Sequence, residues 1–263
     1  MRNMKNETMD VIEKRGSLRA FSNEPITKEE EDAIIHAAMR APSAGNQMMY
    51  SMIIIRDQKK KELLAEACDH QPFIAKAPLM IVFVADHQRW FDYFQSRGVK
   101  EFCKAKDRLF EAPQESELML AIEDAMIAAQ NSVIAAQSMN IGSCYIGDIL
   151  ENGEYIKELL QLPQYTMPIG MVVYGHYPDG FPHLIRERFD RKFIVFEDVY
   201  HSLNETERDE MFHDLEQKFQ LDNPYGAENY AQQFYARKTG ASFSKEMARS
   251  VRFWLKQWDG RLL

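Results

Sequence analysis

Two arginines and a serine near the start of the chain have the types and the spacing of an anion-binding segment. Arg15, Ser17 and Arg19 alternate within the segment RGSLRAF at residues 15–21. A planar guanidinium group can donate two hydrogen bonds to neighbouring phosphate oxygens. Gly16 lets the backbone come close to whatever the arginines hold. We therefore expect this segment to bind a phosphorylated cofactor, provided that other parts of the chain complete the site.

Polar residues in loops between apolar segments could supply the rest of such a site. They are Ser43, Asn46 and Gln47 in one loop, Gln71 in another, and the pair Arg186 and Arg188. The last two are two residues apart, so in an extended segment both side chains point to one side. Amide side chains both donate and accept hydrogen bonds, which suits the edge of a heterocycle such as flavin.

The overall charge of the chain limits its partners. The 263 residues carry 40 acidic and 32 basic side chains, for a net charge of −8 at pH 7. Nucleic acids and anionic membranes favour a basic surface, so neither is expected to be a partner. The content of 45% hydrophobic and 27% charged residues is that of an ordinary globular protein. A bound anion would therefore have to be held by a local cluster of cations.

The sequence lacks the common patterns of protein-based nucleophiles and metal sites. It has no P-loop, no G-x-G-x-x-G, no H-E-x-x-H and no G-x-S-x-G. The seven histidines show no metal-ligand spacing, and Cys68, Cys103 and Cys144 are too far apart to suggest a disulfide framework. We expect no metal and no catalytic side chain, so the chemistry would come from a bound organic cofactor.

Targeting signals are not expected either. The first ten residues are polar and charged, unlike a signal peptide, and no run of about 18 apolar residues is present. Three unpaired thiols are typical of a reducing compartment. These features favour a cytoplasmic protein without a membrane span.

The elements that position these residues can be predicted from local patterns. Thr27 and Glu30 form a potential capping box at the start of a helix that ends before Pro42. Apolar runs predict strands over residues 50–55, 79–85, 143–146 and 168–174. Helices are predicted over residues 59–67, 86–115, 117–139 and 154–161.

Two helical regions suggest contacts beyond a single core. Residues 117–139 are apolar around most of the helix circumference, as in a central core helix or one shared with a second subunit. Beyond Tyr200 no strand pattern appears, and residues 204–220, 227–237 and 244–258 predict helices. The last two are rich in aromatic residues, which favours an arm that covers another surface.

Five segments, in order, resemble motifs of the nitroreductase family, and within it the NADPH-dependent flavin reductase/nitroreductase A group. The segment RGSLRAF is similar to (H/R)-R-S-x-R-x-F, and residues 41–47 are similar to A-P-S-S-x-N-x-Q. Residues 70–78 resemble G-Q-x-x-V-x-x-A-P, and residues 141–147 resemble G-L-G-x-x-Y-I-G. Residues 175–188 resemble G-(Y/H)-P followed by (K/R)-x-R. Together the resemblance covers residues 10–200.

The resemblance implies both a fold and an activity. The fold would be α+β, a mostly antiparallel sheet flanked by helices, in an intertwined homodimer with two FMN molecules at the interface. Residues 1–203 would form the FMN-binding core, and residues 204–263 a helical C-terminal extension packing on the dimer. The activity would be that of an NAD(P)H-dependent FMN oxidoreductase, which passes two electrons by a ping-pong mechanism to nitroaromatics, quinones or free flavin.

Carried over by position, the resemblance also assigns the contacts to FMN. They are Arg15, Gly16, Ser17, Leu18, Arg19, Ser43, Asn46, Gln47, Gln71, Tyr145, Ile146, Gly147, Asp148, Arg186 and Arg188. Arg237 stands where the group has an arginine associated with the phosphate of NADPH. Gly16 replaces an arginine of the group, and Phe243-Ser244 replaces Trp-Ser, so the choice between NADPH and NADH stays open.

Two other functions remain open at this point. The same fold could carry a specialised flavin reaction, such as dehydrogenation or dehalogenation. Alternatively, the chain could be a non-enzymatic flavin-binding or interaction protein whose aromatic C-terminal helices bind a partner.

Overall fold

The structure is a computed structural model that describes residues 6–261. The chain forms two compact units: residues up to Ile185 together with those from Glu246 onward make unit 1, and Arg186–Lys245 make unit 2. The sequence placed a single boundary at residue 203, whereas the structure changes unit at 185 and returns to unit 1 at 246. The difference arises because the end of the chain packs into the core of unit 1.

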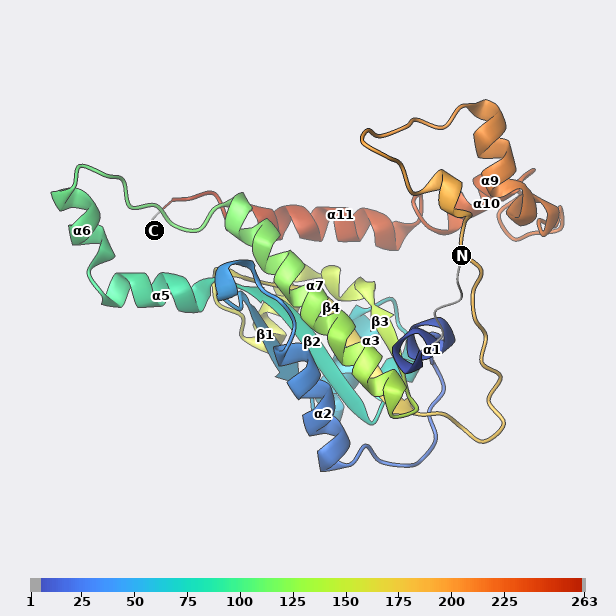
Figure 1. Cartoon of the computed structure of the whole chain (residues 1–263), viewed down its shortest axis with the longest axis horizontal. Helices are drawn as coiled ribbons and strands as arrows, with labels where there is room; N and C mark the ends of the chain where they lie inside the picture. Colours follow the sequence, from blue (N-terminus) through green and yellow to red (C-terminus); the bar gives the residue numbers. More distant parts are fainter. Residues whose placement is uncertain (1–5, 262–263) are drawn as a thin grey trace. The chain divides into compact units, whose positions relative to one another are not determined.

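Unit 1 is built on a four-stranded sheet in the order β1-β2-β4-β3. The strands are β1 (Tyr50–Ile54), β2 (Leu79–Asp86), β3 (Ile141–Ile146) and β4 (Thr166–His176). Every neighbouring pair is antiparallel, which confirms the predicted sheet (Figure 1). The continuous apolar run of β2 is buried along its whole length, as expected of an inner strand.

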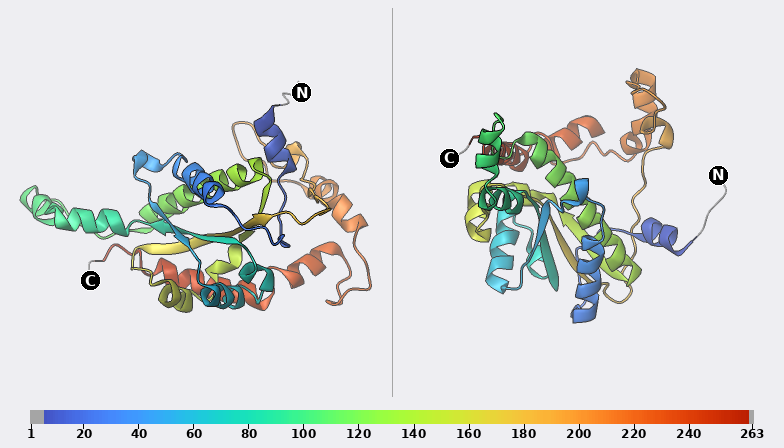
Figure 2. Two further views of the ribbon diagram at one scale, coloured as in Figure 1. Left: turned by 90° about the horizontal axis from the view of Figure 1, so that it is seen from below. Right: turned by 60° about the vertical axis from the view of Figure 1, so that its left-hand side comes forward.

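Helices α2 (Lys28–Met39) and α7 (Glu115–Ser138) pack on one face of this sheet (Figure 2). Side chains at alternate positions of β2, such as Ile81 and Phe83, face them and are fully buried. The predicted capping box of α2 is confirmed. The Thr27 N–H donates to Glu30 Oε2 at 2.8 Å, and the Glu30 N–H donates to Thr27 Oγ1 at 3.2 Å.

The other face of the sheet is covered by four helices. They are α3 (Gln58–Ala67), α4 (Pro72–Ala75), α8 (Gly153–Leu160) and the later part of α11 (Ser242–Leu255). Trp254 and Trp258 are fully buried in the same cluster as Met80 and Val82 of β2. These two tryptophans therefore belong to the core of unit 1, within the region 204–263 that the sequence assigned to a helical C-terminal extension.

Helix α7 is buried on one side only. Ala125, Ala128 and Ala129 pack against the sheet, whereas Leu120 and Ile127 are each 40% exposed. Among the helices of residues 6–261, α7 alone is long and apolar enough to span a membrane by length and composition. Its packing against β2 accounts for that composition as well, since a core helix passes the same test.

The region predicted to be helical over residues 86–115 is less regular. It forms two short helices, α5 (Gln88–Ser96) and α6 (Val99–Ala105), followed by a non-helical stretch. Gly98 has a positive φ of 68° and interrupts the helix, a conformation that glycine adopts without steric cost. Figure 1 shows both helices projecting away from the sheet.

Unit 2 contains helices and no strand within its 186–245 range. Its elements are the short helix η3 (Arg191–Phe193), α9 (Glu205–Gln217), α10 (Tyr230–Arg237) and the first turn of α11. Phe189 contacts Phe212 of α9, with ring centroids 5.3 Å apart. Most of its other side chains are exposed, so unit 2 has only a small core of its own.

Candidate functional site

The segment 15–21 lies along the edge of the sheet in unit 1. Helix α1 (Glu7–Lys14) ends where the Arg15 N–H donates to Val11 O at 3.2 Å. The extended chain that follows forms a parallel bridge between Ser17 and Ser143 of β3, and the Leu18 N–H donates to Ser143 O at 2.8 Å. The segment thus covers the outer edge of β3.

Two glycines of the sheet make room for this segment. Gly142 of β3 pairs with Gly175 of β4. A Cβ atom on Gly142 would lie 2.8 Å from Leu18 Cβ, and one on Gly175 would lie 2.9 Å from Phe21 Cγ. Leu18 is fully buried, so its side chain anchors the segment and does not face a ligand.

Because side chains alternate along an extended chain, the burial of Leu18 leaves Ser17 and Arg19 exposed. Both approach the end of β3. Burial raises the pKa of the Cys144 thiol, and the neighbouring Arg19, Ser17 and Arg15 partly oppose that rise. The structure therefore brings the polar side chains of the opening segment to Cys144, next to the predicted contact residues 145–148.

Tyr145 and Gly147 lie at the same end of β3 as Cys144. Burial raises the pKa of the Tyr145 phenol to about 12, and the charge of Arg15 acts against that change. Gly147 begins the short helix η2 (Gly147–Leu150), is exposed, and has only open space where a Cβ atom would be. A flat group could approach the Gly147 backbone closely. Ile146 is buried, so only its backbone could face such a group.

Gln71 also reaches this end of β3. It precedes α4 and is half-buried. Its side-chain Nε2 donates to Asp148 Oδ2 at 2.7 Å and to the Cys68 carbonyl oxygen at 3.0 Å. The sequence placed Gln71 and Asp148 in one site, and the structure joins them directly across 77 residues of chain.

Two arginines of the cluster, Arg15 and Arg19, carry charges that the part of the chain described by the structure does not pair with a carboxylate. Within residues 6–261, no acidic oxygen lies within 4.0 Å of a guanidinium nitrogen of Arg15 or Arg19. These features fit a planar ring that carries an anionic group. The two arginines can bind the anionic group, the Gln71 amide can bind the ring edge, and the open backbone at Gly147 lets the ring come close. FMN has both parts, so the residues present fit this cofactor.

The loop with Ser43, Asn46 and Gln47 lies elsewhere in unit 1. It includes the short helix η1 (Ala44–Asn46) and leads into β1, at the opposite edge of the sheet from β3. Three strand spacings separate β1 from β3, or about 14 Å. Within one chain, the structure does not bring this loop to the Arg15 cluster.

A buried carboxylate on α7 organises that loop. Asp124 accepts a hydrogen bond from Ser43 Oγ at 2.7 Å, and others from the N–H groups of Ala44 at 2.9 Å and Met49 at 3.1 Å. Ser43 Oγ accepts in turn from the Met48 N–H at 2.6 Å. The Ser43 hydroxyl is therefore already committed within the chain, which leaves Asn46 and Gln47 more available.

The remaining predicted residues lie in unit 2. Arg186 and Arg188 are exposed, and Arg188 Nη1 donates to the carbonyl oxygens of Arg186 at 2.8 Å and Glu187 at 3.2 Å. Arg237 is also exposed, with its guanidinium carbon 5.7 Å from the centre of the Phe234 ring. These arginines are described within unit 2 alone, and their assignment to the cofactor stays a prediction.

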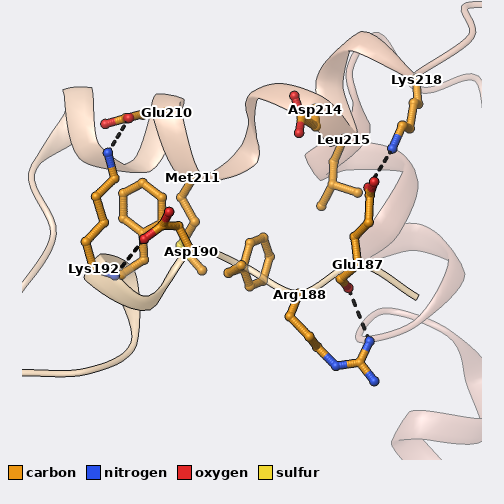
Figure 3. A pocket seen from close by; sticks show the side chains of 11 residues that line it. Glu187, Arg188, Asp190, Lys192, Glu210, Met211, Asp214, Leu215 and Lys218 are labelled. Carbon is orange, nitrogen blue, oxygen red and sulfur yellow. Dashed lines mark hydrogen bonds and ion pairs between the residues drawn. The ribbon is translucent and has the colours of Figure 1, made fainter. Parts of the chain in front are cut away.

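A hollow in unit 2 includes Arg188 (Figure 3). Its volume is about 370 Å³, and Phe189, Met211 and Leu215 form part of its lining. Around it Lys218 pairs with Glu187 at 3.2 Å, and Lys192 pairs with Glu210. Most of its charges are thus matched, and the hollow is not lined by residues of the Arg15 cluster.

Two buried acidic residues in and near the candidate site were not predicted from the sequence. Asp124 and Glu151 are both buried acids, and neither belongs to a motif. Among the described residues, 6–261, none hydrogen-bonds to Glu151 Oε1. Burial together with nearby Asp148, Asp69 and Glu246 raises the pKa of Glu151 to about 7. The acidic Asp124 within an otherwise apolar helix could have indicated a buried polar contact. Its partners Ser43 and Ala44, however, lie about 80 residues away in the sequence.

The comparisons with known proteins agree on one family. A family model described as the nitroreductase family matches residues 12–176. The chain is 32% identical to an FMN reductase [NAD(P)H] of Bacillus subtilis over 66% of this chain and 67% of that protein. It is 31% identical to an oxygen-insensitive NADPH nitroreductase of Salmonella typhimurium over 75% of this chain and 76% of that protein.

Solved structures share the fold at lower identity. Nitroreductase A from Vibrio parahaemolyticus superimposes with a TM-score of 0.79 at 24% identity, over 98% of this chain and 100% of that one. An NADPH:FMN oxidoreductase from Vibrio harveyi, complexed with NAD⁺, gives a TM-score of 0.74 at 24% identity, over 95% of this chain and 98% of that one.

Proposed function

The chain belongs to the nitroreductase family, and on this basis we propose that it is an FMN-dependent NAD(P)H oxidoreductase. It would pass two electrons by a ping-pong mechanism to nitroaromatics, quinones or free flavin. The observation that supports the proposal lies at the end of β3, where Arg15, Ser17 and Arg19 lie near Cys144 and Gln71 is hydrogen-bonded to Asp148, next to Gly147.

In this proposal the side chains bind and orient the cofactor. When bound, FMN supplies the hydride and electron-pair chemistry. Arg15, Ser17 and Arg19 hold its anionic groups, and fixed cations beside a ring favour added negative charge there. Gln71 contacts the ring edge, and the backbone of residues 145–148 allows close approach. No side chain of the chain acts as an acid, base or nucleophile.

We propose that the active form is a homodimer. The Ser43 loop and the Arg15 cluster lie at opposite edges of one sheet, so a second copy is needed to bring Asn46 and Gln47 to the cofactor. The exposed apolar side chains of α7 support this arrangement, because a large apolar surface on a soluble chain usually marks an interface. They are Met119, Leu120, Met126 and Ile127.

Unit 2 would complete the assembly. In the proposal Arg186 and Arg188 bind the FMN phosphate, and Arg237 binds the phosphate of the nicotinamide donor. The aromatic side chains of α10, among them Phe234 and Tyr235, are exposed and would cover part of the partner subunit. The sequence features described above also lead us to propose a cytoplasmic location.

Absorbance spectroscopy of the purified protein tests the function directly. The protein should be yellow, release FMN on denaturation, and lose its 450 nm absorbance when NADPH or NADH is added without oxygen. Anaerobic stopped-flow titration with each donor would then identify the preferred one. A colourless protein that does not take up FMN would contradict the proposal.

A further inference from the structure

The amide of Gln71 is oriented by its neighbours. Its nitrogen donates to Asp148 Oδ2 at 2.7 Å and to the Cys68 carbonyl at 3.0 Å. Both partners accept hydrogen bonds and cannot donate them, so the amide must present its NH₂ group to them. The two N–H bonds of Gln71 are thereby used, and only its oxygen, Oε1, is left for a ligand.

The backbone holds Gln71 in place as well. The Gln71 N–H donates to Ala65 O at 3.0 Å, and the Ile74 N–H donates to Gln71 O at 3.1 Å. The side chain is therefore fixed at both of its ends. Asp148 is free to serve as its acceptor, because no cation within residues 6–261 forms an ion pair with the Asp148 carboxylate.

We propose that Asp148 is a positioning residue that makes Gln71 an obligate hydrogen-bond acceptor, selecting a cofactor ring that presents an N–H at this edge. The inference rests on the proposed function. The isoalloxazine ring carries such a group, the imide N–H between two carbonyls. A ring without a donor at this position would leave Gln71 Oε1 unpaired against it, which is unfavourable in a partly buried site.

The test compares the binding of FMN with that of 3-methyl-FMN, in which a methyl group replaces the imide hydrogen. Both are titrated into cofactor-free protein and followed by flavin fluorescence. Wild type should bind 3-methyl-FMN at least about tenfold more weakly, which is about 1.4 kcal/mol. In Asp148→Ala the amide can rotate, so the ratio of the two dissociation constants should fall to about threefold or less.

Two further variants separate orientation from other effects. Asp69→Asn removes one negative charge nearby without touching Gln71, and asparagine tolerates the positive φ of 56° at this position. Asp69→Asn should keep the wild-type ratio of the dissociation constants for 3-methyl-FMN and FMN. Gln71→Met removes the amide, and should lower the ratio as much as Asp148→Ala does. The double variant should lower it no further, because Asp148 acts through Gln71.

The outcomes distinguish this inference from the proposed function. If wild type does not bind FMN, the proposed function fails. If FMN binds but 3-methyl-FMN binds equally well, or if the ratio is unchanged in Asp148→Ala, only the inference on Asp148 is overturned. Should Asp148→Ala not fold, an unchanged ratio in Gln71→Met would overturn it as well.

Discussion

The guanidinium groups of Arg15 and Arg19 lie near the end of β3, and no carboxylate of residues 6–261 pairs with them. The chain as a whole has a net charge of −8, so the positive charge at this place comes from a few arginines and not from the overall composition. Its effect on binding should therefore be visible when a single arginine is removed.

We expect Arg19→Ala to weaken FMN binding by about tenfold or more, because a charge-assisted hydrogen bond contributes roughly 1.5–3 kcal/mol. Fluorescence titration of cofactor-free protein measures the change. Arg40→Ala is a suitable control, since Arg40 is an exposed arginine at the end of α2. A variant that stays fully yellow on dilution would show that Arg19 does not hold the cofactor.

The buried carboxyl group of Glu151 makes the stability of the fold depend on pH. Burial, with Asp148, Asp69 and Glu246 nearby, raises its pKa from an ordinary 4.5 to about 7. Between these two pH values the folded protein keeps the proton and the unfolded chain loses it, so folding becomes less favourable as the pH rises. The contribution of this group is fully present below pH 4.5 and is lost as the pH rises through 7.

Relative to wild type, Glu151→Gln should therefore gain about 2 kcal/mol of stability between pH 5 and pH 8. Urea denaturation at the two pH values measures this difference. The control is Glu154→Gln, because its partner Arg249 lowers the pKa of Glu154 to about 2 and the effect should be nearly equal at both values. An identical pH dependence in wild type and Glu151→Gln would contradict the assignment.

The pair of glycines in β3 and β4, Gly142 and Gly175, determines where the opening segment can lie. We predict that Gly142→Ala lowers the free energy of unfolding by about 2 kcal/mol, as overpacking does, because the new Cβ would lie 2.8 Å from Leu18 Cβ and 2.9 Å from Tyr177 Cζ. FMN affinity should fall too, as the shift of Leu18 displaces its neighbours Ser17 and Arg19.

Gly170→Ala in β4 provides the matched control. A Cβ atom there would make only an ordinary contact, 3.5 Å from Met126 Sδ. Its effect in urea denaturation should stay below about 0.5 kcal/mol. If the two substitutions lowered the free energy of unfolding equally, the close packing of Leu18 against Gly142 would not contribute to stability.

The sequence predicted the elements better than their long-range contacts. Apolar periodicity located β2, β4 and α7 to within a few residues, since each packs an apolar surface against the core. It overestimated the helix at 86–115, because Gly98 was not recognised as a break.

Contacts between segments that are distant in the sequence were harder to predict. The contact between Ser43 and Asp124 depends on how a loop and a helix meet in three dimensions, and local pattern carries no sign of it. The resemblance did place Gln71 and Asp148 in one site, although not their direct hydrogen bond. The burial of Trp254 and Trp258 was missed because aromatic residues suit a core and an interface equally well.

For the whole molecule, the proposed dimer links the exposed side of α7 to cofactor binding. We predict that Ile127→Glu, which places a charge on that apolar surface, produces a monomer that retains little FMN. Light scattering coupled to size-exclusion chromatography gives the mass, and absorbance at 450 nm gives the cofactor content. Leu109→Glu is the control, because Leu109 is 85% exposed and lies outside α7. A dimeric Ile127→Glu with full cofactor would argue against this interface.

The bridge between Ser17 and Ser143 has a consequence for handling the protein. Beyond β3 the sheet would end in unpaired backbone groups, and such an edge can recruit strands from other molecules. The segment that shields it is the one proposed to hold the cofactor. Loss of FMN would then loosen the shield, so cofactor-free preparations should aggregate sooner than yellow ones on storage.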